Sequence, residues 1–168
     1  MTGLDTIAMF SKYLRSLERW IGKAQEYAAA RAFDPEVLVA ARLAPDQFAF
    51  VRQIQAACDT AKLSASKLAG VEPPSHPDTE KTIDELKARL HTCLAYLEGL
   101  GPDKLAGSEE RAIQHTWMQG KHMRGADYIA HYAIPNFLFH IVTAYDILRH
   151  GGVPLGKMDF LRPMPLEG

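Results

Sequence analysis

The chain has 168 residues, of which 47% are hydrophobic and 23% charged, with a formal net charge of −1. This composition is typical of one globular domain, which we expect to span residues 1–168. The 19 Lys and Arg residues are balanced by 20 Asp and Glu residues and form no long basic run, which argues against nucleic-acid binding. No apolar stretch approaches the ~20 residues that span a bilayer. Because Met1–Phe10 also lacks the pattern of a secretory signal, we expect a cytoplasmic protein without membrane partners.

A first long helix is predicted over Ile7–Ala28, where apolar residues recur at alternating spacings of three and four. Thr2 followed three residues later by Asp5 is typical of a helix N-cap. Asp34 then precedes a proline, a pattern that predicts a short additional helix over residues 35–42 because Asp caps a helix and proline fits its first turn.

The second and third long helices are separated by a connection that contains three prolines. The second is predicted over residues 46–69 and ends at Gly70, a typical stop signal. The third is predicted to begin at Asp78 or Thr79 and to end near Leu97. The length of the connection leaves room for a crossover between these helices.

A change of periodicity precedes the last helix. Residues 113–123 alternate in polarity around Gln119 and Gly120, which favours a small hairpin. The last helix is predicted over residues 125–149, with a kink or a restart near Ile134, because Pro135 removes a backbone donor. The sequence therefore predicts an all-α four-helix bundle with a short additional helix and a small hairpin.

Polar residues border the apolar stripes of two of these helices. Asn136, His140 and Thr143 share one arc of the last helix, beside its apolar arc. Gln53 and Asp59 flank a stripe of alanines on the second helix. If the two helices face each other, these five residues form a small-molecule pocket. The alternative is a buried hydrogen-bonded network that only orders the bundle.

No catalytic motif accompanies these residues. The chain has no G-x-S-x-G elbow, no glycine-rich phosphate loop and no HExxH pair. Cys58 and Cys93 lie within apolar stripes, which predicts buried, reduced thiols. In the hairpin, His122 is expected opposite Trp117, on the same face as His115. The two imidazoles either share a ligand or, as the favoured alternative, are solvated histidines beside a tryptophan. No reaction is assigned from the sequence.

Two stretches carry a family resemblance: DQFAFVRQIQAACDTAKLSASKLAG on the second helix and IPNFLFHIVTAYDILRHGGVPLGKMDF at the fourth. They resemble an uncharacterised family of bacterial and fungal proteins, of unknown function, that is placed with the DinB/YfiT-like four-helix bundles. The resemblance implies an up-down-down-up bundle and a homodimer. It also implies a metal held by one histidine of the second helix and two of the fourth, which sometimes serves thiol-dependent transferases.

The metal ligands implied by the resemblance are incomplete in this sequence. His140 matches the first histidine of the fourth helix, whereas Ala144 replaces the second. Gln53, Gln55 or Asp59 stands where the second helix would supply histidine. We therefore expect a degenerate metal site without a cofactor, in a bundle that is non-catalytic or binds a small molecule.

Two alternative functions stay open. In the first, His140 and Asp59 hold a divalent ion for a thiol transferase or hydrolase. In the second, the protein is a dimeric interaction module whose proline-rich tail, Val153–Leu166, docks on its own bundle or on a partner subunit.

Overall fold

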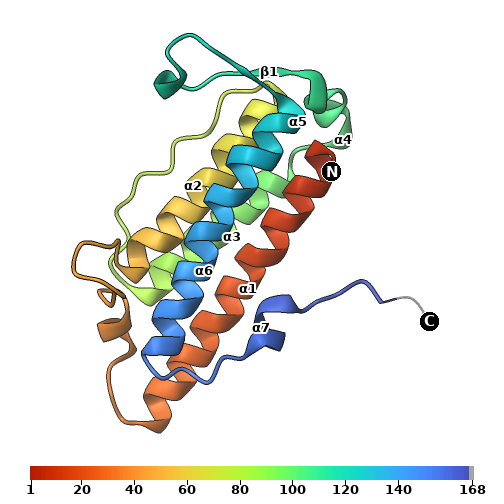
Figure 1. Cartoon of the computed structure of the whole chain (residues 1–168). Coiled ribbons are helices and arrows are strands. Elements are labelled where there is room, and N and C mark those ends of the chain that lie inside the picture. Colours follow the sequence, from red (N-terminus) through yellow and green to blue (C-terminus); the bar gives the residue numbers. More distant parts are fainter. Residues whose placement is uncertain (167–168) are drawn as a thin grey trace.

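Four long helical segments lie side by side around one hydrophobic core in the computed structural model, which describes residues 1–166 (Figure 1). The all-α prediction is therefore confirmed for these residues, and Glu167 and Gly168 of the expected domain lie outside them. The elements in chain order are α1 (Gly3–Ala30), η1 (Pro35–Leu38), α2 (Phe50–Ala69), α3 (Ile83–Glu98), α4 (Pro102–Leu105), η2 (Ser108–Glu110), β1 (Ala112–Ile113), η3 (Thr116–Met118), β2 (Met123–Arg124), α5 (Gly125–Tyr128), η4 (Ile129–Ala133), α6 (Ile134–His150) and α7 (Lys157–Leu161).

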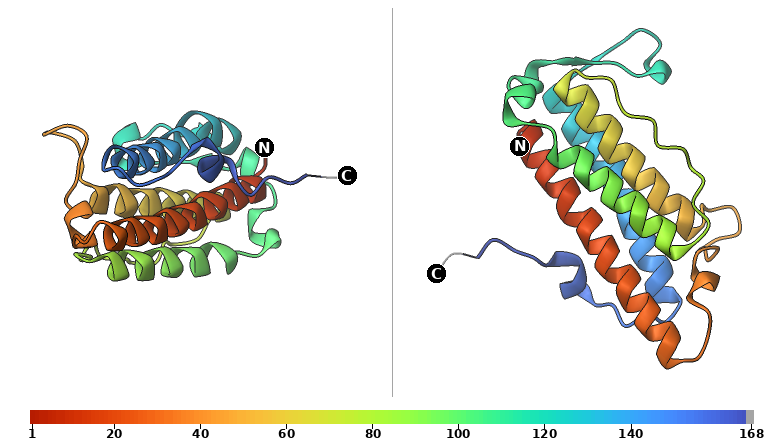
Figure 2. Two further views of the ribbon diagram at one scale, coloured as in Figure 1. Left: turned by 90° about the horizontal axis from the view of Figure 1, so that it is seen from below. Right: turned by 180° about the vertical axis from the view of Figure 1, so that it is seen from behind.

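The course of the helices is up-down-down-up. Helices α1 and α6 run in one direction and α2 and α3 in the other (Figures 1 and 2). Because α2 and α3 are parallel, the connection 70–82 must cross the length of the bundle, and it does so along the outside of α2. The view from below shows α1 and α2 between α3 on one side and α6 on the other (Figure 2). Helix α2 therefore contacts both α3 and α6.

Helix α1 begins as the sequence predicts, whereas α2 and α3 begin later. Thr2 and Asp5 form a capping box at the start of α1. Helix α2 begins at Phe50 rather than at residue 46, because the Phe50 amide donates to the Ala41 carbonyl at 2.8 Å. This bond, and a second from Val51 to Val39, tie the start of α2 to the chain after η1, so η1 stops at Leu38 instead of reaching residue 42.

The start of α3 is fixed by a capping box between Thr82 and Glu85. Asp78 and Thr79, which the sequence suggested as caps, instead lie in the extended connection. The Asp78 carboxylate forms ion pairs with Arg52 and Arg89 and so is not available to cap a helix. The predicted start of the third helix is therefore wrong by several residues.

The segment before the fourth helix pairs as a short antiparallel ladder. Ala112 lies opposite Arg124 and Ile113 opposite Met123. The pairing stops there, because residues 114–122 form a loop that contains η3 rather than two longer strands joined at Gln119 and Gly120. The expected cross-strand pair of His122 and Trp117 is therefore wrong.

The fourth helix is interrupted as predicted. A single π-helical turn, η4, separates α5 from α6, and Pro135 lies in the first turn of α6. Proline lacks a backbone donor, so the ladder of hydrogen bonds has to shift at this point. The interruption lies beside the polar residues of the candidate site.

The C-terminal segment docks on its own chain. The Phe160 ring packs against Tyr13, Trp20 and Tyr145, with centroid distances of 5.0, 5.7 and 5.8 Å. The Trp20 indole donates to the Asp159 carbonyl at 3.2 Å, and Lys23 pairs with the Asp159 carboxylate. Of the two positions considered for the tail, the structure has the one on its own bundle.

Both cysteines are free and buried, as predicted. The Cys93 thiol donates to the Cys58 carbonyl at 3.4 Å. The contact with the Cys93 thiol, together with burial, holds the pKa of the Cys58 thiol well above its usual value, so the thiolate is disfavoured. Within residues 1–166, none of the helices combines the length and apolar character needed to cross a membrane.

Candidate functional site

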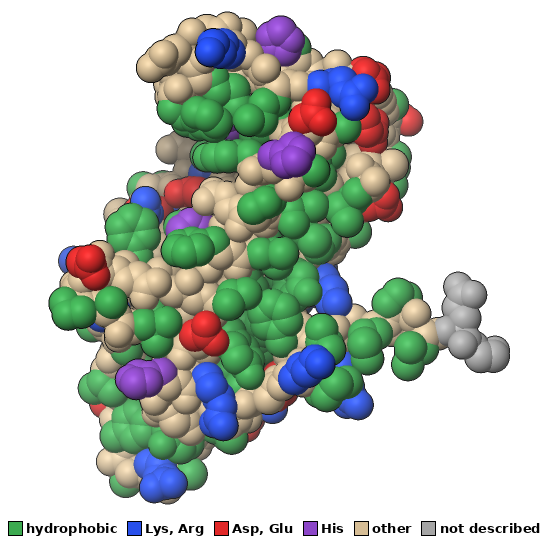
Figure 3. Space-filling view, in the orientation of Figure 1, with side chains coloured by type: hydrophobic (Ala, Val, Ile, Leu, Met, Phe, Trp, Pro, Cys, Tyr) green, Lys and Arg blue, Asp and Glu red, His purple; other side chains and the backbone are tan. Residues whose placement is uncertain are grey.

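A cavity of about 310 Å³ lies between α2 and the α5–α6 segment. Its volume is at the lower end of the range of small-molecule sites, roughly 300 to 1,000 Å³. Histidine side chains lie among hydrophobic ones on the face of the molecule that includes α6 (Figure 3). The cavity is lined by Phe48, Arg52, Ala56, Asp59, Thr60, Leu63, Ser64, His115, Tyr128, Tyr132, Asn136 and His140.

His140 is held in one orientation by Gln53. The Gln53 amide nitrogen donates to the Phe48 carbonyl at 3.1 Å, so its oxygen is turned toward the imidazole. His140 Nδ1 then donates to that oxygen at 2.8 Å. Because Nδ1 carries the proton, Nε2 has a free lone pair, and no residue of the described chain bonds to it.

The His140 imidazole is neutral near pH 7. Burial lowers its pKa below the ordinary value of 6.5, and the nearby Arg52 guanidinium lowers it further. The cavity therefore contains a fixed hydrogen-bond acceptor on an aromatic ring. Such a group can accept a proton or a hydrogen bond from a bound molecule.

The other end of the cavity holds a second polar chain. The Tyr128 hydroxyl lies 3.0 Å from Ser64 Oγ and 3.1 Å from His115 Nε2. Burial raises the pKa of Tyr128 to about 12, so its hydroxyl keeps its proton. Between the two ends, Asn136 Nδ2 donates to Thr60 Oγ1 at 2.9 Å. All these groups are neutral hydrogen-bonding groups rather than charges.

The five residues predicted from the sequence as a pocket do not all line the cavity. Asn136 and His140 line the cavity, and Gln53 lies behind His140. Asp59 lies at the cavity wall, but its carboxylate pairs with Arg89 at 2.9 Å and Lys62 at 3.0 Å. Thr143 bonds back to the Phe139 carbonyl at 2.7 Å and lies outside the lining.

Most of the lining was not predicted, including the polar residues Ser64, Tyr128 and His115. Ser64 lies among the apolar residues of the second helix, and Tyr128 gives no polar signal at the start of the last helix. His115 was expected beside His122, which instead lines a separate hollow with Trp117. The position of Ser64 among apolar residues was the one available signal for this part of the site, because a buried serine needs a hydrogen-bond partner.

The donors in the cavity do not fit the three-histidine metal site that the resemblance implies. His140 supplies one free nitrogen, Ala144 has no donor, and Gln53 is engaged on both sides of its amide. Asp59 is neutralised by two cations. Within residues 1–166, no cluster of three His, Cys, Asp or Glu side chains is arranged to hold an ion. One imidazole beside an amide is a weak ligand set for a transition metal.

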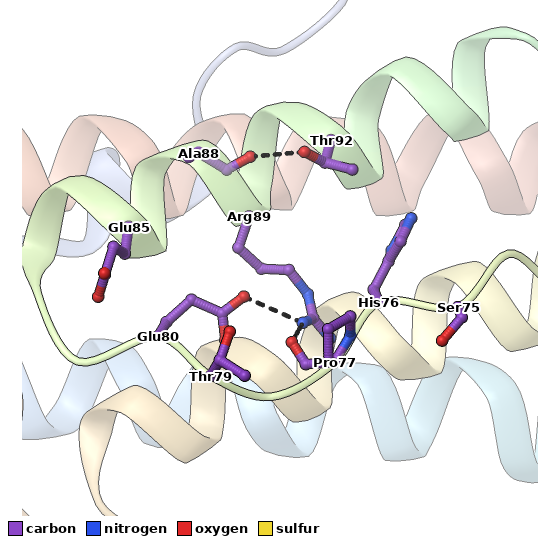
Figure 4. A pocket seen from close by; sticks show the side chains of 9 residues that line it. All are labelled: Ser75, His76, Pro77, Thr79, Glu80, Glu85, Ala88, Arg89 and Thr92. Atoms are coloured by element: carbon purple, nitrogen blue, oxygen red, sulfur yellow. Dashed lines mark hydrogen bonds and ion pairs between the residues drawn. The ribbon is translucent and has the colours of Figure 1, made fainter.

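A second cavity of similar volume lies between the connection 70–82 and α3 (Figure 4). Here Arg89 projects from α3 and donates to the Pro77 carbonyl at 3.0 Å and to Glu80 at 3.1 Å. These bonds attach the connection to the bundle. Because the Arg89 guanidinium is already engaged in attaching the connection, we place the candidate site at His140.

Acid pH is expected to destabilise the protein before its carboxylates titrate. Burial lowers the pKa of His76, His115 and His140 below 6.5, so below that pH the unfolded chain binds more protons than the folded one. Stability is therefore complete above pH 6.5 and falls as the pH decreases through the window below it. Urea unfolding at pH 7.5 and 5.5 measures the loss.

The contribution of His140 to this loss can be isolated. His140→Gln should reduce the difference between the two pH values, whereas His131→Gln, at an exposed position of η4, should leave it unchanged. An equal effect of both variants would contradict the assignment to the buried imidazole.

Comparison with known proteins places this fold. A family model described as a domain of unknown function, DUF1993, matches residues 5–161. The chain is also similar to a DinB family member protein from Shewanella denitrificans, whose crystal structure superposes with a TM-score of 0.94. The two sequences are 42% identical, and the match covers 98% of this chain and 94% of that one. A comparison with curated proteins found no match.

Proposed function

The chain belongs to the DUF1993 family of domains of unknown function, and from this premise we propose that it is a DinB-like bundle that binds a small planar molecule beside His140, without a metal. The observation that carries the proposal is the hydrogen bond from His140 Nδ1 to Gln53. It leaves Nε2 as a fixed acceptor in a cavity of ligand size. Nε2 is bonded to no side chain or backbone group of residues 1–166, so a bound molecule can donate to it without breaking a contact within the protein.

The walls of the cavity favour a planar ligand. Tyr128 and Tyr132 stack at 5.5 Å, and His115 lies 5.1 Å from the Tyr132 ring. Phe48 is half exposed at the opposite end of the same cavity. Aromatic side chains offer a flat apolar surface to a ring, and His140 then selects a ring that carries an N–H or O–H donor.

No metal takes part in this proposal. The metal-dependent thiol transferase or hydrolase needs at least two strong donors on one ion, and His140 is the single free imidazole facing this cavity from α2 or α6 of the described chain. A neutral acceptor in a half-apolar cavity suits recognition of a neutral donor.

The proposal is tested with indole, a planar ring with one N–H, and 1-methylindole, which lacks that donor. By ligand-observed NMR, the protein should bind indole about five- to tenfold more tightly, the effect of one buried hydrogen bond. His140→Leu replaces the imidazole with an apolar side chain of similar size and should abolish the preference for indole over 1-methylindole. Ala56→Phe, which fills the cavity from α2, should abolish binding of both compounds.

The control adds the same bulk elsewhere. Ala29→Phe lies at an exposed position near the end of α1 and should leave binding unchanged. If indole and 1-methylindole bind equally to the wild-type protein, or if Ala56→Phe binds both, the ligand site is not at His140.

The homodimer implied by the resemblance stays a prediction. The docked part of the C-terminal tail is not free to form it, because Leu155 is buried and Phe160 packs on α1 of the same chain. An interface would therefore use other exposed apolar residues, of which α6 carries Phe139 and Val142.

A further inference from the structure

A second hollow continues the cavity along α2. It lies against the loop 114–120, and its lining includes Leu63 and His115, which also line the cavity beside His140. The two spaces adjoin at these shared residues, and we call them together the α2 groove. Lys67 lies at the end of the groove that is farther from His140.

The Lys67 ammonium has donors to spare. Its Nζ donates to the Gln114 carbonyl at 2.6 Å, which uses one of three N–H bonds. No salt bridge joins Lys67 to a carboxylate anywhere in residues 1–166, and the lining of the hollow contains no Asp or Glu. The cation is therefore held in place by the loop but is not neutralised.

The groove as a whole carries excess positive charge. In its lining, Arg52 and Lys67 accompany a single carboxylate of the described residues, Asp59. Asp59 is already balanced by Lys62, and Arg89 is shared among three carboxylates, so the surplus charge is that of Lys67. Arg52, near His140, is paired with Asp78 outside the lining. A bound anion at Lys67 would compensate the remaining charge.

Each of the two histidines of the groove has a cationic side chain nearby that lowers its pKa. Burial lowers the pKa of His115, and Lys67 lowers it further. Burial lowers the pKa of His140, and Arg52 lowers it further. No carboxylate raises either pKa, so both rings lie in a region of positive potential.

Helix geometry gives the expected distance between the two ends of the groove. Gln53, the partner of His140, and Lys67 are separated by about 21 Å along α2 at 1.5 Å per residue. Side chains on helices lean toward the helix N-terminus, and α2 and α6 are antiparallel. We therefore expect a gap of roughly 10 to 15 Å between Lys67 and His140, the length of a ring with a short acidic side chain.

We propose that the ligand of the α2 groove is an aromatic carboxylate, with its ring beside His140 and Tyr132 and its carboxylate on Lys67. This inference rests on the function proposed above and adds the acidic group to it. The ring N–H or O–H donates to His140 Nε2, and the Lys67 ammonium donates to the carboxylate.

The test uses indole-3-butyrate and its neutral amide, indole-3-butyramide, which differ in charge but hardly in shape. The wild-type protein should bind the acid about tenfold more tightly than the amide, as expected for a hydrogen bond between two charged groups. Lys67→Gln keeps a donor for the Gln114 carbonyl but removes the charge, and should remove this preference. Lys104→Gln, at an exposed position of α4, is the matched control.

A second measurement locates the carboxylate. Saturating indole-3-butyrate should raise the pKa of the His115 ring, followed by NMR, whereas indole-3-butyramide should not. If both compounds bind equally and Lys67→Gln changes neither, the acidic group is wrong and the proposed function stands. If neither compound nor indole binds, the proposed function itself fails.

Discussion

Replacing Arg89 with methionine is expected to lower the free energy of unfolding by about 3 to 5 kcal/mol, the usual effect of removing one partner of a buried ion pair. The Arg89 side chain is only 2% exposed. It donates to the Asp59, Asp78 and Glu80 carboxylates at 2.9 to 3.1 Å, and to the Pro77 carbonyl. Methionine fills the space but leaves three carboxylates facing one another. Urea unfolding at pH 7.5 measures the loss.

The position of Arg89 explains why the effect should be large. The parallel course of α2 and α3 requires a long connection, and this connection has no helix or strand of its own. Arg89 fastens it at Pro77 and Glu80 (Figure 4). It also pairs with Asp78 of the connection and with Asp59 of α2. One guanidinium therefore joins three parts of the bundle.

The control for this prediction is Arg52→Met. Arg52 also pairs with Asp78, but its side chain is 39% exposed. An exposed pair contributes about 1 kcal/mol or less, so this variant should be nearly as stable as the wild type. If the two variants lose equal stability, the buried network is not what holds the connection 70–82.

Local patterns in the sequence were enough to predict the helices and the interruption of the last one. The spacing of three and four from Ile7 to Ala28 gives the buried face of α1, and Pro135 marks the start of α6. The starts of α2 and α3 were misplaced because the partners that decide them are distant. The Phe50 amide at the start of α2 donates to the Ala41 carbonyl, and Asp78 pairs with Arg89 instead of capping α3.

The candidate site was predictable where helix geometry alone decides. His140 and Asn136 on one helix and Gln53 on the other could be placed by their phase relative to the apolar stripes. The contact of Ser64 with Tyr128 joins residues 64 positions apart through an irregular segment, and no local pattern encodes it. The pairing of Asp59 with Arg89 across two helices was missed for the same reason.

Gly125 should tolerate no side chain. It opens α5, and a Cβ added there would lie 1.8 Å from the Ser108 carbonyl oxygen, a backbone atom that cannot rotate away. Gly125→Ala should therefore lower the free energy of unfolding by about 3 kcal/mol, at the upper end of overpacking effects. Gly22→Ala is the matched control, because no atom lies within 4 Å of the added Cβ on α1. That variant should gain about 0.5 to 1 kcal/mol, since alanine favours a helix interior.

The same substitution should also weaken the candidate site. Gly125 is in the same short helix as Tyr128, whose hydroxyl joins Ser64 to His115 at the wall of the cavity. Moving α5 away from Ser108 would displace Tyr128, so Gly125→Ala should bind indole more weakly even at temperatures where it is fully folded. Gly22→Ala should bind it normally. Equal binding by both variants would mean that the cavity wall does not depend on the contact between α5 and η2.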